Sequence, residues 1–226
     1  MEAKPLYSSS FPETSEVKSE LRECTVGGFL DELADRVPAP GGGATAALHL
    51  AQAAALLGMV ARYTTGAKYV QHNEIISEMI VATDSARARG LRLADADANA
   101  FSAVSEAYKL PRDTQQQKRR RQTVIACALV KAAGPPADVI TGAAALLTMA
   151  EGLLPIANPT VITDVAAATE AARAAATTAR LNVEINLGGI TDETVRATLA
   201  LVLDQVEPII VRADVVQKSV RERLGS

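Results

Sequence analysis

The sequence predicts an all-α fold, a bundle of about six or seven helices. Apolar residues recur at steps of three and four along most of the 226 residues, whereas the alternation typical of strands is not sustained anywhere. Only 3% of the residues are aromatic, and the apolar residues are mostly Ala, Leu, Val and Ile. Such small side chains suit closely packed helices, so one helical domain is expected.

Glycines and prolines divide the chain into seven helical segments. Thr25 is a candidate N-cap for the first. We expect Gly134 to end the fourth helix and Pro135 to begin the fifth, because proline is favoured in the first helical turn. The predicted helices span about residues 26–36, 44–63, 73–108, 114–133, 135–154, 161–184 and 192–223.

The domain organisation follows from these segments. Residues 1–22 show no sustained period and are expected to form a mobile N-terminal tail, and residues 23–226 a single helical domain. The helix at 44–63 is apolar almost all round, which places it centrally. The helices carry more apolar surface than one small bundle buries easily, so a homodimer is expected.

Composition excludes several classes of protein. The net charge is −3 and the pI about 5.5, so no basic field attracts nucleic acid. Cys24 and Cys127 are far apart in the sequence, which fits free thiols in a reducing cytosol better than a disulfide. His49 and His72 have no second metal ligand at helical spacing. We find neither a signal core nor an uninterrupted membrane span. The sequence therefore predicts a soluble, cytoplasmic protein without metal, nucleic-acid or membrane partners.

The glycine loop is the first candidate for a functional site. Pro38 and Pro40 fix the direction of the chain, and Gly41, Gly42 and Gly43 lead directly into the Ala-rich helix. Bare N–H groups at a helix start can approach an anionic or polar ligand closely. The alternative is a tight turn at which two helices touch.

A carboxylate interrupts the apolar face of the third helix. Asp97 lies in register with Leu93, Phe101 and Val104, whereas Asp95 is rotated about 160° away and should be solvated. An ionised carboxylate on such a face is costly unless it is paired. Asp97 therefore either forms a salt bridge with an Arg of a neighbouring helix, or occupies a fringe position that reaches water, or is an acid, base or cation stabiliser with a raised pKa.

Polar residues also mark the sixth helix and two helix ends. Asp164 and Asn182 share a face, and Asn186 follows one turn later, so a ligand, another subunit or a helix-end cap is expected to meet them. Lys109 and Arg112 flank a proline at a helix end, where a cation is favourable. The basic run at 118–121 points in all directions and is typical of a solvated face, although one member could meet an anionic tail.

Several motifs in one order resemble the cyclodeaminase domain of the formiminotransferase-cyclodeaminase family and its stand-alone relatives, the methenyltetrahydrofolate cyclohydrolases. The motifs are Pro-Ala-Pro-Gly-Gly-Gly at 38–43, Asp-Ala-Asp-Ala-Asn-Ala-Phe at 95–101, Tyr-Lys-Leu-Pro at 108–111, Ala-Asn-Pro at 157–159 with Asp164, and Asn-Val-Glu-Ile-Asn-Leu at 182–187. The resemblance runs from about Thr25 to the C-terminus. It implies a helical homodimer that binds a tetrahydrofolate derivative as substrate, with the site near the subunit interface and a formiminotransferase as possible partner.

The resemblance also implies roles for residues. Asp97 would be the catalytic acid or base at the bridge between N5 and N10 of the folate. Cyclodeamination to 5,10-methenyltetrahydrofolate and ammonia is the first candidate reaction, cyclohydrolysis of the methenyl compound is the second, and a non-catalytic folate-binding or oligomeric interaction protein is the third. The substrate would meet Gly41, Gly42, Gly43, Lys109, Arg112, Asn158, Asp164, Asn182 and Asn186.

The chain departs from the family pattern at three positions. Ala44 and Thr45 follow the glycines where the family has Ser, so a hydroxyl donor would be displaced or lost. Thr163 stands for the Ser before Asp164, and Arg112 stands for the Lys after Leu-Pro, which keeps the charge but changes the geometry. Of these, Ala44 bears most directly on catalysis.

Overall fold

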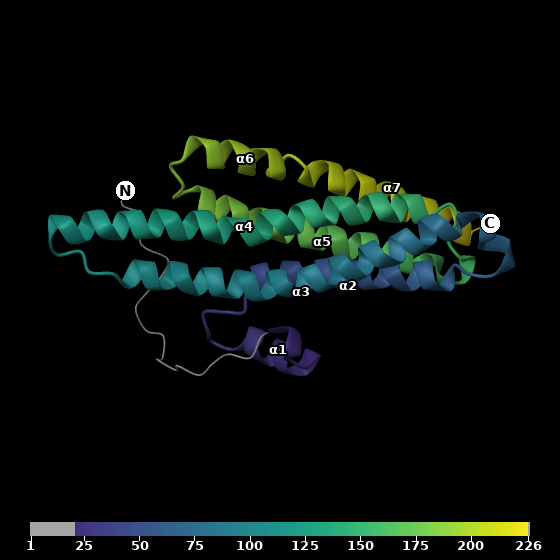
Figure 1. Ribbon diagram of the computed structural model, residues 1–226, viewed down its shortest axis with the longest axis horizontal. Helices are drawn as coiled ribbons and strands as arrows, with labels where there is room; N and C mark the ends of the chain where they lie inside the picture. The colour runs from purple at the N-terminus through teal and green to yellow at the C-terminus, as the bar shows by residue number, and fades with distance from the viewer. Residues whose placement is uncertain (1–20, 226) are drawn as a thin grey trace.

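The computed structural model describes residues 21–225, and in this range it contains seven α-helices, three short 3₁₀ segments and no strand (Figure 1). The all-α prediction is therefore confirmed for the described residues. The α-helices are α1 (Val26–Ala34), α2 (Gly42–Tyr63), α3 (Asn73–Lys109), α4 (Gln115–Leu153), α5 (Ile162–Leu187), α6 (Glu193–Leu203) and α7 (Val206–Leu224). The 3₁₀ segments are η1 (Leu21–Glu23), η2 (Ala67–His72) and η3 (Pro159–Val161).

The predicted tail overlaps η1 at its C-terminal end, while its residues 1–20 lie outside the described residues. The backbone N–H of Leu21 donates to Asp95 Oδ1 at 2.6 Å. Asp95, which the helical register predicted to be solvated, is instead half-buried under η1. The chain segment just before the bundle is thus anchored to α3.

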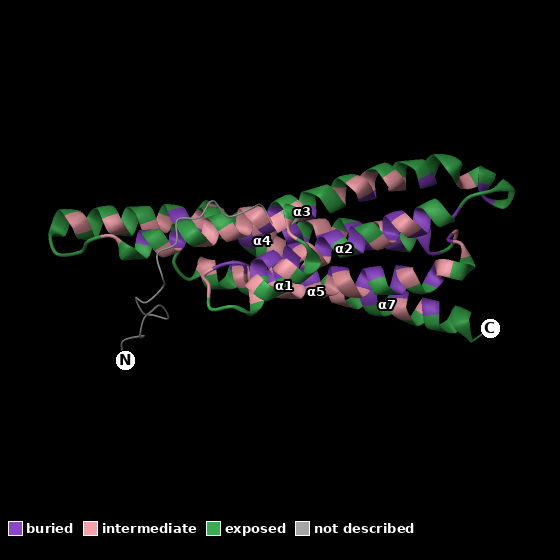
Figure 2. Cartoon of the chain, turned by 90° about the horizontal axis from the view of Figure 1, so that it is seen from below, coloured by how far each residue is buried: buried purple, intermediate pink, exposed green. Residues whose placement is uncertain are grey.

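α2 is the central helix, as its apolar composition predicts. It packs most extensively against α3 and α5, and also contacts α4. Ala46, Ala53, Ala54 and Val60 are fully buried, and Figure 2 shows buried residues concentrated where these helices meet. Small side chains allow the helices to approach closely. The start of α2 is therefore held between α3 and α5.

α2 and α3 approach most closely at Gly90. A Cβ added at Gly90 would lie 2.9 Å from the Cβ and the backbone N of Ala51 and 3.0 Å from the carbonyl oxygen of Ala47. Two of these neighbours are backbone atoms of a helix and cannot move aside easily. Gly90 therefore fixes the distance between the two helices.

The predicted boundary between a fourth and a fifth helix is wrong, because α4 continues through Gly134, Pro135 and Pro136. Gly134 has no Cβ to clash with the ring of Pro135, so the helix can continue through this position instead of ending there. Buried residues on both sides of the prolines, such as Ala133 and Val139, hold α4 against the bundle. Tertiary packing thus offsets the hydrogen bonds that the prolines cannot donate.

The predicted last helix, at 192–223, is likewise wrong as a single element. It divides into α6 and α7 at a turn formed by Asp204 and Gln205. Pro208 follows in the first turn of α7, where its missing N–H would have no partner within the helix. The proline is the signal in the sequence for a helix start at this point.

α6 and α7 lie along one long edge of the bundle, over α4 and α5 (Figure 1). Arg212 of α7 donates from Nε to Glu151 Oε1 of α4 at 2.8 Å. Arg173 of α5 donates from Nη1 to Asp214 Oδ1 of α7 at 2.7 Å. These pairs supplement an apolar seam that includes Ile209.

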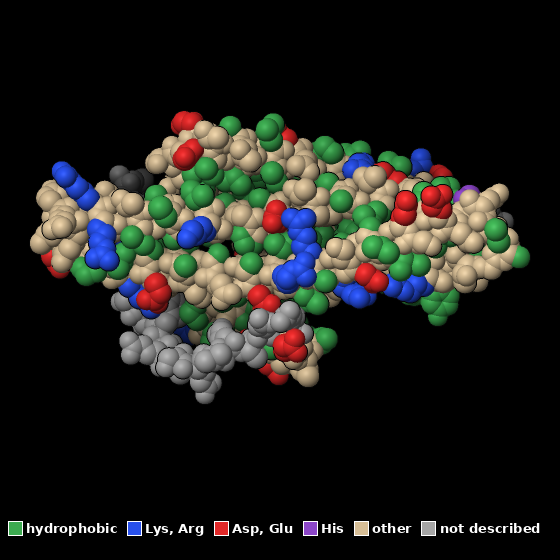
Figure 3. Space-filling model, viewed as in Figure 1, with side chains coloured by type: hydrophobic (Ala, Val, Ile, Leu, Met, Phe, Trp, Pro, Cys, Tyr) green, Lys and Arg blue, Asp and Glu red, His purple; other side chains and the backbone are tan. Residues whose placement is uncertain are grey.

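The α3–α4 hairpin projects past the other helices at one end of the molecule (Figure 1). Its free end is mostly exposed or half-buried in Figure 2, and Lys and Arg side chains lie near it in Figure 3. Thr114 and Gln117 form a capping box at the start of α4. The hairpin thus carries cations away from the core.

Two helices are long and apolar enough to cross a membrane by length and composition alone, contrary to the sequence-based expectation. They are α2, with mean hydropathy 1.5 in its most apolar window, and α4, with 1.4. In α2, 61% of that window is buried by the bundle. The apolar character of α2 is therefore explained by its central position among other helices.

Candidate functional site

The Asp97 carboxyl group lies against the first turn of α2. Asp97 is half-buried in the C-terminal half of α3, and its carboxylate accepts a hydrogen bond from the backbone N–H of Ala44. A Cβ built on Gly43 would lie less than 3.0 Å from Cγ and both carboxyl oxygens. The carboxyl group therefore fills the space that a side chain at position 43 would need.

Burial determines the electrostatics of Asp97. Desolvation raises the pKa of its carboxyl group to about 6, and the hydrogen bond from Ala44 N–H opposes this rise. The ion pairs found among the described residues do not include Asp97. The Asp97 carboxyl group thus has a raised pKa and forms no ion pair with another described residue.

α5 completes this junction of three helices. A Cβ on Gly42 would lie 3.8 Å from Asn182 Nδ2 and 4.0 Å from Thr178 Cγ2, so the start of α2 faces both residues. Asn182 Nδ2 donates to the carbonyl of Thr178 at 2.9 Å, and Asn186 Nδ2 donates to that of Asn182 at 2.7 Å. Each side-chain amide thus uses one of its two N–H donors within α5, and its oxygen is a hydrogen-bond acceptor.

Ala44 and Thr45 follow the glycines, and their contacts show that Ala at position 44 is compatible with the hydrogen bond to Asp97. Ala44 is fully buried and reaches Asp97 through its backbone N–H, so this bond does not depend on its side chain. The hydroxyl of Thr45 donates to the carbonyl of Gly41 at 3.0 Å. The Thr45 hydroxyl is therefore engaged at the start of α2, and the loss of Ser at 44 leaves the Asp97 contact unchanged.

Asn158 and Asp164 lie at the opposite end of α2 and α5. Asn158 donates from Nδ2 to the carbonyl of Tyr63 at 2.9 Å and from its backbone N–H to Thr64 Oγ1 at 3.1 Å. Asp164 stands in the first turn of α5, five helical turns or about 27 Å along the axis from Asn182. One chain therefore does not bring Asn158 and Asp164 together with Asn182 and Asn186.

Lys109 and Arg112 lie at the free end of the α3–α4 hairpin, about 18 Å along α3 from Asp97. Lys109 Nζ is paired with Glu106 Oε1 at 2.7 Å, and Arg112 is exposed in the connection to α4. Arg121, from the basic run, donates from Nη2 to the carbonyl of Tyr108 at 3.0 Å and lies over its ring. These cations form a second group, separate from the Asp97 junction.

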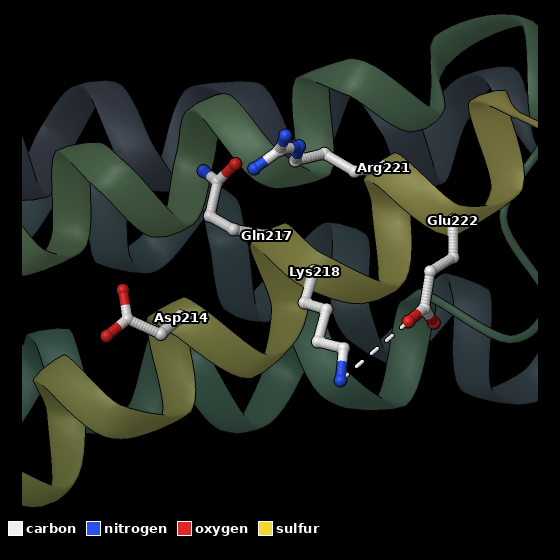
Figure 4. A pocket seen from close by; sticks show the side chains of 5 residues that line it. All are labelled: Asp214, Gln217, Lys218, Arg221 and Glu222. Atoms are coloured by element: carbon white, nitrogen blue, oxygen red, sulfur yellow. Dashed lines mark ion pairs between the residues drawn. The ribbon is translucent and has the colours of Figure 1, made fainter.

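A surface pocket on α7 carries none of the predicted site residues. It is lined by Asp214, Gln217, Lys218, Arg221 and Glu222, and Figure 4 shows Lys218 and Glu222 directed toward each other. Their charged atoms are 3.9 Å apart. Among the described residues, no group of three or more His, Cys, Asp or Glu side chains is placed to hold a metal ion.

The contact between Gly43 and Asp97 has no signal in the local sequence, because the two residues lie on different helices. Thr178 is a further member of the junction. It lies one turn before Asn182 on the same face of α5, so the helical register of the sequence could have identified it. The junction therefore comprises Gly42, Gly43, Asp97, Thr178 and Asn182.

Comparison with known proteins identifies the family. Residues 25–205 match the family described as Formiminotransferase-cyclodeaminase. A methenyltetrahydrofolate cyclohydrolase of Methylorubrum extorquens is 32% identical over 89% of this chain and 96% of its own length. Formimidoyltransferase-cyclodeaminase of Mus musculus is 33% identical over 83% of this chain, which spans 34% of that protein.

A solved structure has the same architecture. Formiminotetrahydrofolate cyclodeaminase of Thermotoga maritima superposes with a TM-score of 0.75 and 30% sequence identity, covering 91% of this chain and 98% of the other. The family match, the two relatives and the superposition agree with the ordered motifs and with the placement of Asp97 at the start of α2. The chain therefore belongs to the formiminotransferase-cyclodeaminase family.

Proposed function

We propose that the protein is a folate one-carbon enzyme, a formiminotetrahydrofolate cyclodeaminase that forms 5,10-methenyltetrahydrofolate and ammonia. The observation that carries this proposal is the Asp97 carboxyl group, which has a pKa of about 6 at the junction of α2, α3 and α5. A group with a pKa near the working pH exchanges protons efficiently. The named activities of the relatives supply the substrate class.

The proposed reaction needs one proton donor at a defined place. N10 attacks the formimino carbon on N5, so that the N10–C bond forms, and the N10 proton passes to the formimino nitrogen, which becomes an amino group. Protonated Asp97 gives its proton to the formimino nitrogen, the bond between that nitrogen and the carbon breaks, and ammonia leaves. The carboxylate that remains faces the positive charge of the methenyl product, which favours its formation.

The neighbouring residues have binding roles in this proposal. The side-chain oxygens of Asn182 and Asn186 accept hydrogen bonds from N–H groups of the pterin, and Gly41, Gly42 and Gly43 allow the substrate to approach the backbone. Lys109 and Arg112 attract the carboxylates of the glutamate tail at the hairpin end. The tetrahydrofolate derivative is a substrate, and the proposed chemistry uses no metal.

A cyclohydrolase is the second candidate, because the chain spans 96% of a stand-alone relative that bears this name. In that reaction water attacks the methenyl carbon and ionised Asp97 removes one proton from the water. The remaining hydroxyl proton passes to N5 as the C–N5 bond breaks, which gives 10-formyltetrahydrofolate. The same carboxyl group would then act as a base instead of an acid.

The pH dependence distinguishes the two reactions. If Asp97 acts as the acid, kcat falls as the pH rises through about 6; if it acts as the base, kcat rises over the same range. Purified protein is mixed with 5-formiminotetrahydrofolate or 5,10-methenyltetrahydrofolate, and the methenyl absorbance is followed with the rate without enzyme subtracted. Appearance of the chromophore with ammonia supports the cyclodeaminase, and its enzyme-dependent decay supports the cyclohydrolase. Binding of the folate without either change would indicate a non-catalytic binding protein and contradict both.

We also propose that the active unit is a homodimer formed along the outer face of α5. Leu181 and Ile185, one turn apart beside Asn182 and Asn186, are 63% and 62% exposed. Isolated exposed apolar residues are common, but this pair borders the candidate site. A two-fold axis across the middle of α5 would bring the partner's α5 start beside this end. Asn158 and Asp164 would then line the site of the partner subunit.

A further inference from the structure

The first turn of α2 offers an inference that rests on the proposed function and adds a positioning residue to it. Gly43 is buried, and the Asp97 carboxyl group occupies the position of its absent side chain. Gly42, the preceding residue in the same turn, has room for a Cβ, since its nearest neighbours would be 3.8 and 4.0 Å away. Two adjacent glycines in one helical turn thus have opposite steric surroundings.

The backbone conformation does not require glycine at either position. Among the described glycines, only Gly66 has a positive φ, so Gly42 and Gly43 adopt ordinary helical angles that alanine accepts. Alanine also has the higher propensity for helix interiors. The need for glycine at position 43 therefore comes from the Asp97 carboxyl group.

We propose that Gly43 is the positioning residue for Asp97: its missing side chain lets the carboxyl group rest on the Ala44 N–H at the start of α2, directed toward the folate bridge. Any L-residue at position 43 displaces the carboxyl group from this N–H. Bare N–H groups at a helix start can bind an anionic ligand, whereas here the Ala44 N–H at the start of α2 holds the protein's own carboxyl group.

The surroundings of Asp97 are otherwise neutral. Gly43 and Ala44, the residues of α2 beside the Asp97 carboxyl group, carry no charge, and no charged neighbour contributes to the pKa of Asp97. Asp95, two residues away on α3, is held by Leu21 N–H. Displacing the Asp97 carboxyl group therefore changes its burial and its backbone hydrogen bond from Ala44. It does not break an ion pair between described residues.

Gly43→Ala tests the proposal, with Gly27→Ala as the control for turnover, because Gly27 is the second residue of α1, as Gly43 is of α2, and a Cβ there meets nothing within 4 Å. For Gly43→Ala we expect kcat to fall by about 10²-fold with a smaller change in KM, because the reacting group is misplaced while the binding residues remain. Gly27→Ala should retain kcat within about threefold. Equal kcat in the two variants would overturn the proposal.

A second readout does not depend on turnover. In protein labelled with ¹³C-aspartate, the Asp97 carboxyl resonance, assigned by its loss in Asp97→Asn, is titrated by NMR. Gly43→Ala should lower the pKa of this carboxyl group from about 6 toward its ordinary value, because a displaced group regains water. Gly42→Ala should leave the titration unchanged. If wild type turns over neither folate, the proposed function fails, while this titration still decides the role of Gly43.

The fold of Gly43→Ala is controlled in an Asp97→Ala background, where the carboxyl group is absent. Thermal unfolding should show that Gly43→Ala lowers Tm in the wild-type background and does not lower it in Asp97→Ala. Folding of Gly43→Ala only in the Asp97→Ala background would support the same conclusion. A loss of Tm of equal size in both backgrounds, or failure to fold in both, would show that glycine is required for another reason and overturn the proposal.

Discussion

At the scale of single residues, the buried carboxyl group of Asp97 lowers the stability of the fold when it is ionised, and the same burial suits it to the proposed proton transfer. Its pKa rises from 3.8 to about 6 in the folded protein, so the folded state binds the proton more tightly than the unfolded state. Stability contributed by this group is greatest below pH 4, falls as the pH rises through about 6, and stays lower above it. The difference amounts to at most about 3 kcal/mol.

Asp97→Asn should therefore stabilise the protein at high pH and not at low pH. The neutral amide removes the cost of burying an ionised carboxylate, so the free energy of unfolding at pH 8 should rise by about 1 to 3 kcal/mol, with little gain at pH 4. Urea unfolding at pH 4, 6 and 8 measures both values. A gain of the same size at all three values of pH would contradict the burial of an ionisable group at this position.

At the scale of helices, close packing of α2 and α3 depends on the absence of a side chain at Gly90. Gly90→Ala places a Cβ 2.9 Å from the backbone N of Ala51 and should lower the free energy of unfolding by about 1 to 3 kcal/mol. Gly27→Ala is the control, because a Cβ in that exposed part of α1 meets nothing within 4 Å. Gly27→Ala should change stability by less than about 1 kcal/mol. Chemical denaturation compares the variants, and equal values would contradict the packing described for Gly90.

Most helices could be predicted from the sequence because their limits are set locally. Thr25 caps α1 as its side chain predicts, by accepting from the N–H of Gly28 at 3.0 Å. The path of α4 through Pro135 and Pro136 could not be predicted in this way. That continuity depends on buried contacts on both sides of the prolines, which involve residues distant in sequence.

The same distinction applies to the candidate site. Helical register placed Asp97 on the inner face of α3, and the glycine motif placed a special backbone segment before α2. Their contact through Gly43 and Ala44 is a tertiary fact that needed the relative position of two helices. Asp95 shows the limit of register, since η1 covers a side chain that faces away from the apolar line.

At the scale of the whole molecule, the candidate residues fall into separate groups at the two ends of α5 and on the α3–α4 hairpin. Asn158 is held by the end of α2, and its hydrogen bonds to Tyr63 and Thr64 explain its position without a ligand. The proposed two-fold dimer offers one way in which the group at the start of α5 and the group at its end could serve one site.

Complementation tests this dimer. Asp97→Asn and Asp164→Asn should each reduce turnover, and subunits of the two variants, unfolded and refolded together, should regain about a quarter of wild-type activity because half of the dimers carry one intact site. Each variant refolded alone is the control. If the mixture stays at the average of the two single variants, the two residues do not share a site across subunits.

Leu181→Glu gives an independent test of the interface. A charge on the outer face of α5 should oppose association, so light scattering after size exclusion should report the mass of a monomer, about half that of the wild-type protein. Val81→Glu is the control, because Val81 is also highly exposed, at 71%, but lies on α3. A monomeric wild-type protein, or a dimer unaffected by Leu181→Glu, would contradict an interface on α5.

The central claim is that Asp97 transfers the proton at the one-carbon bridge of the folate. The most direct test is kcat of wild type and Asp97→Asn on 5-formiminotetrahydrofolate and 5,10-methenyltetrahydrofolate between pH 5 and pH 8. We predict a loss of about 10²- to 10⁴-fold in Asp97→Asn, together with the disappearance of the wild-type pH dependence near 6. Unchanged turnover of both substrates by Asp97→Asn would contradict the claim.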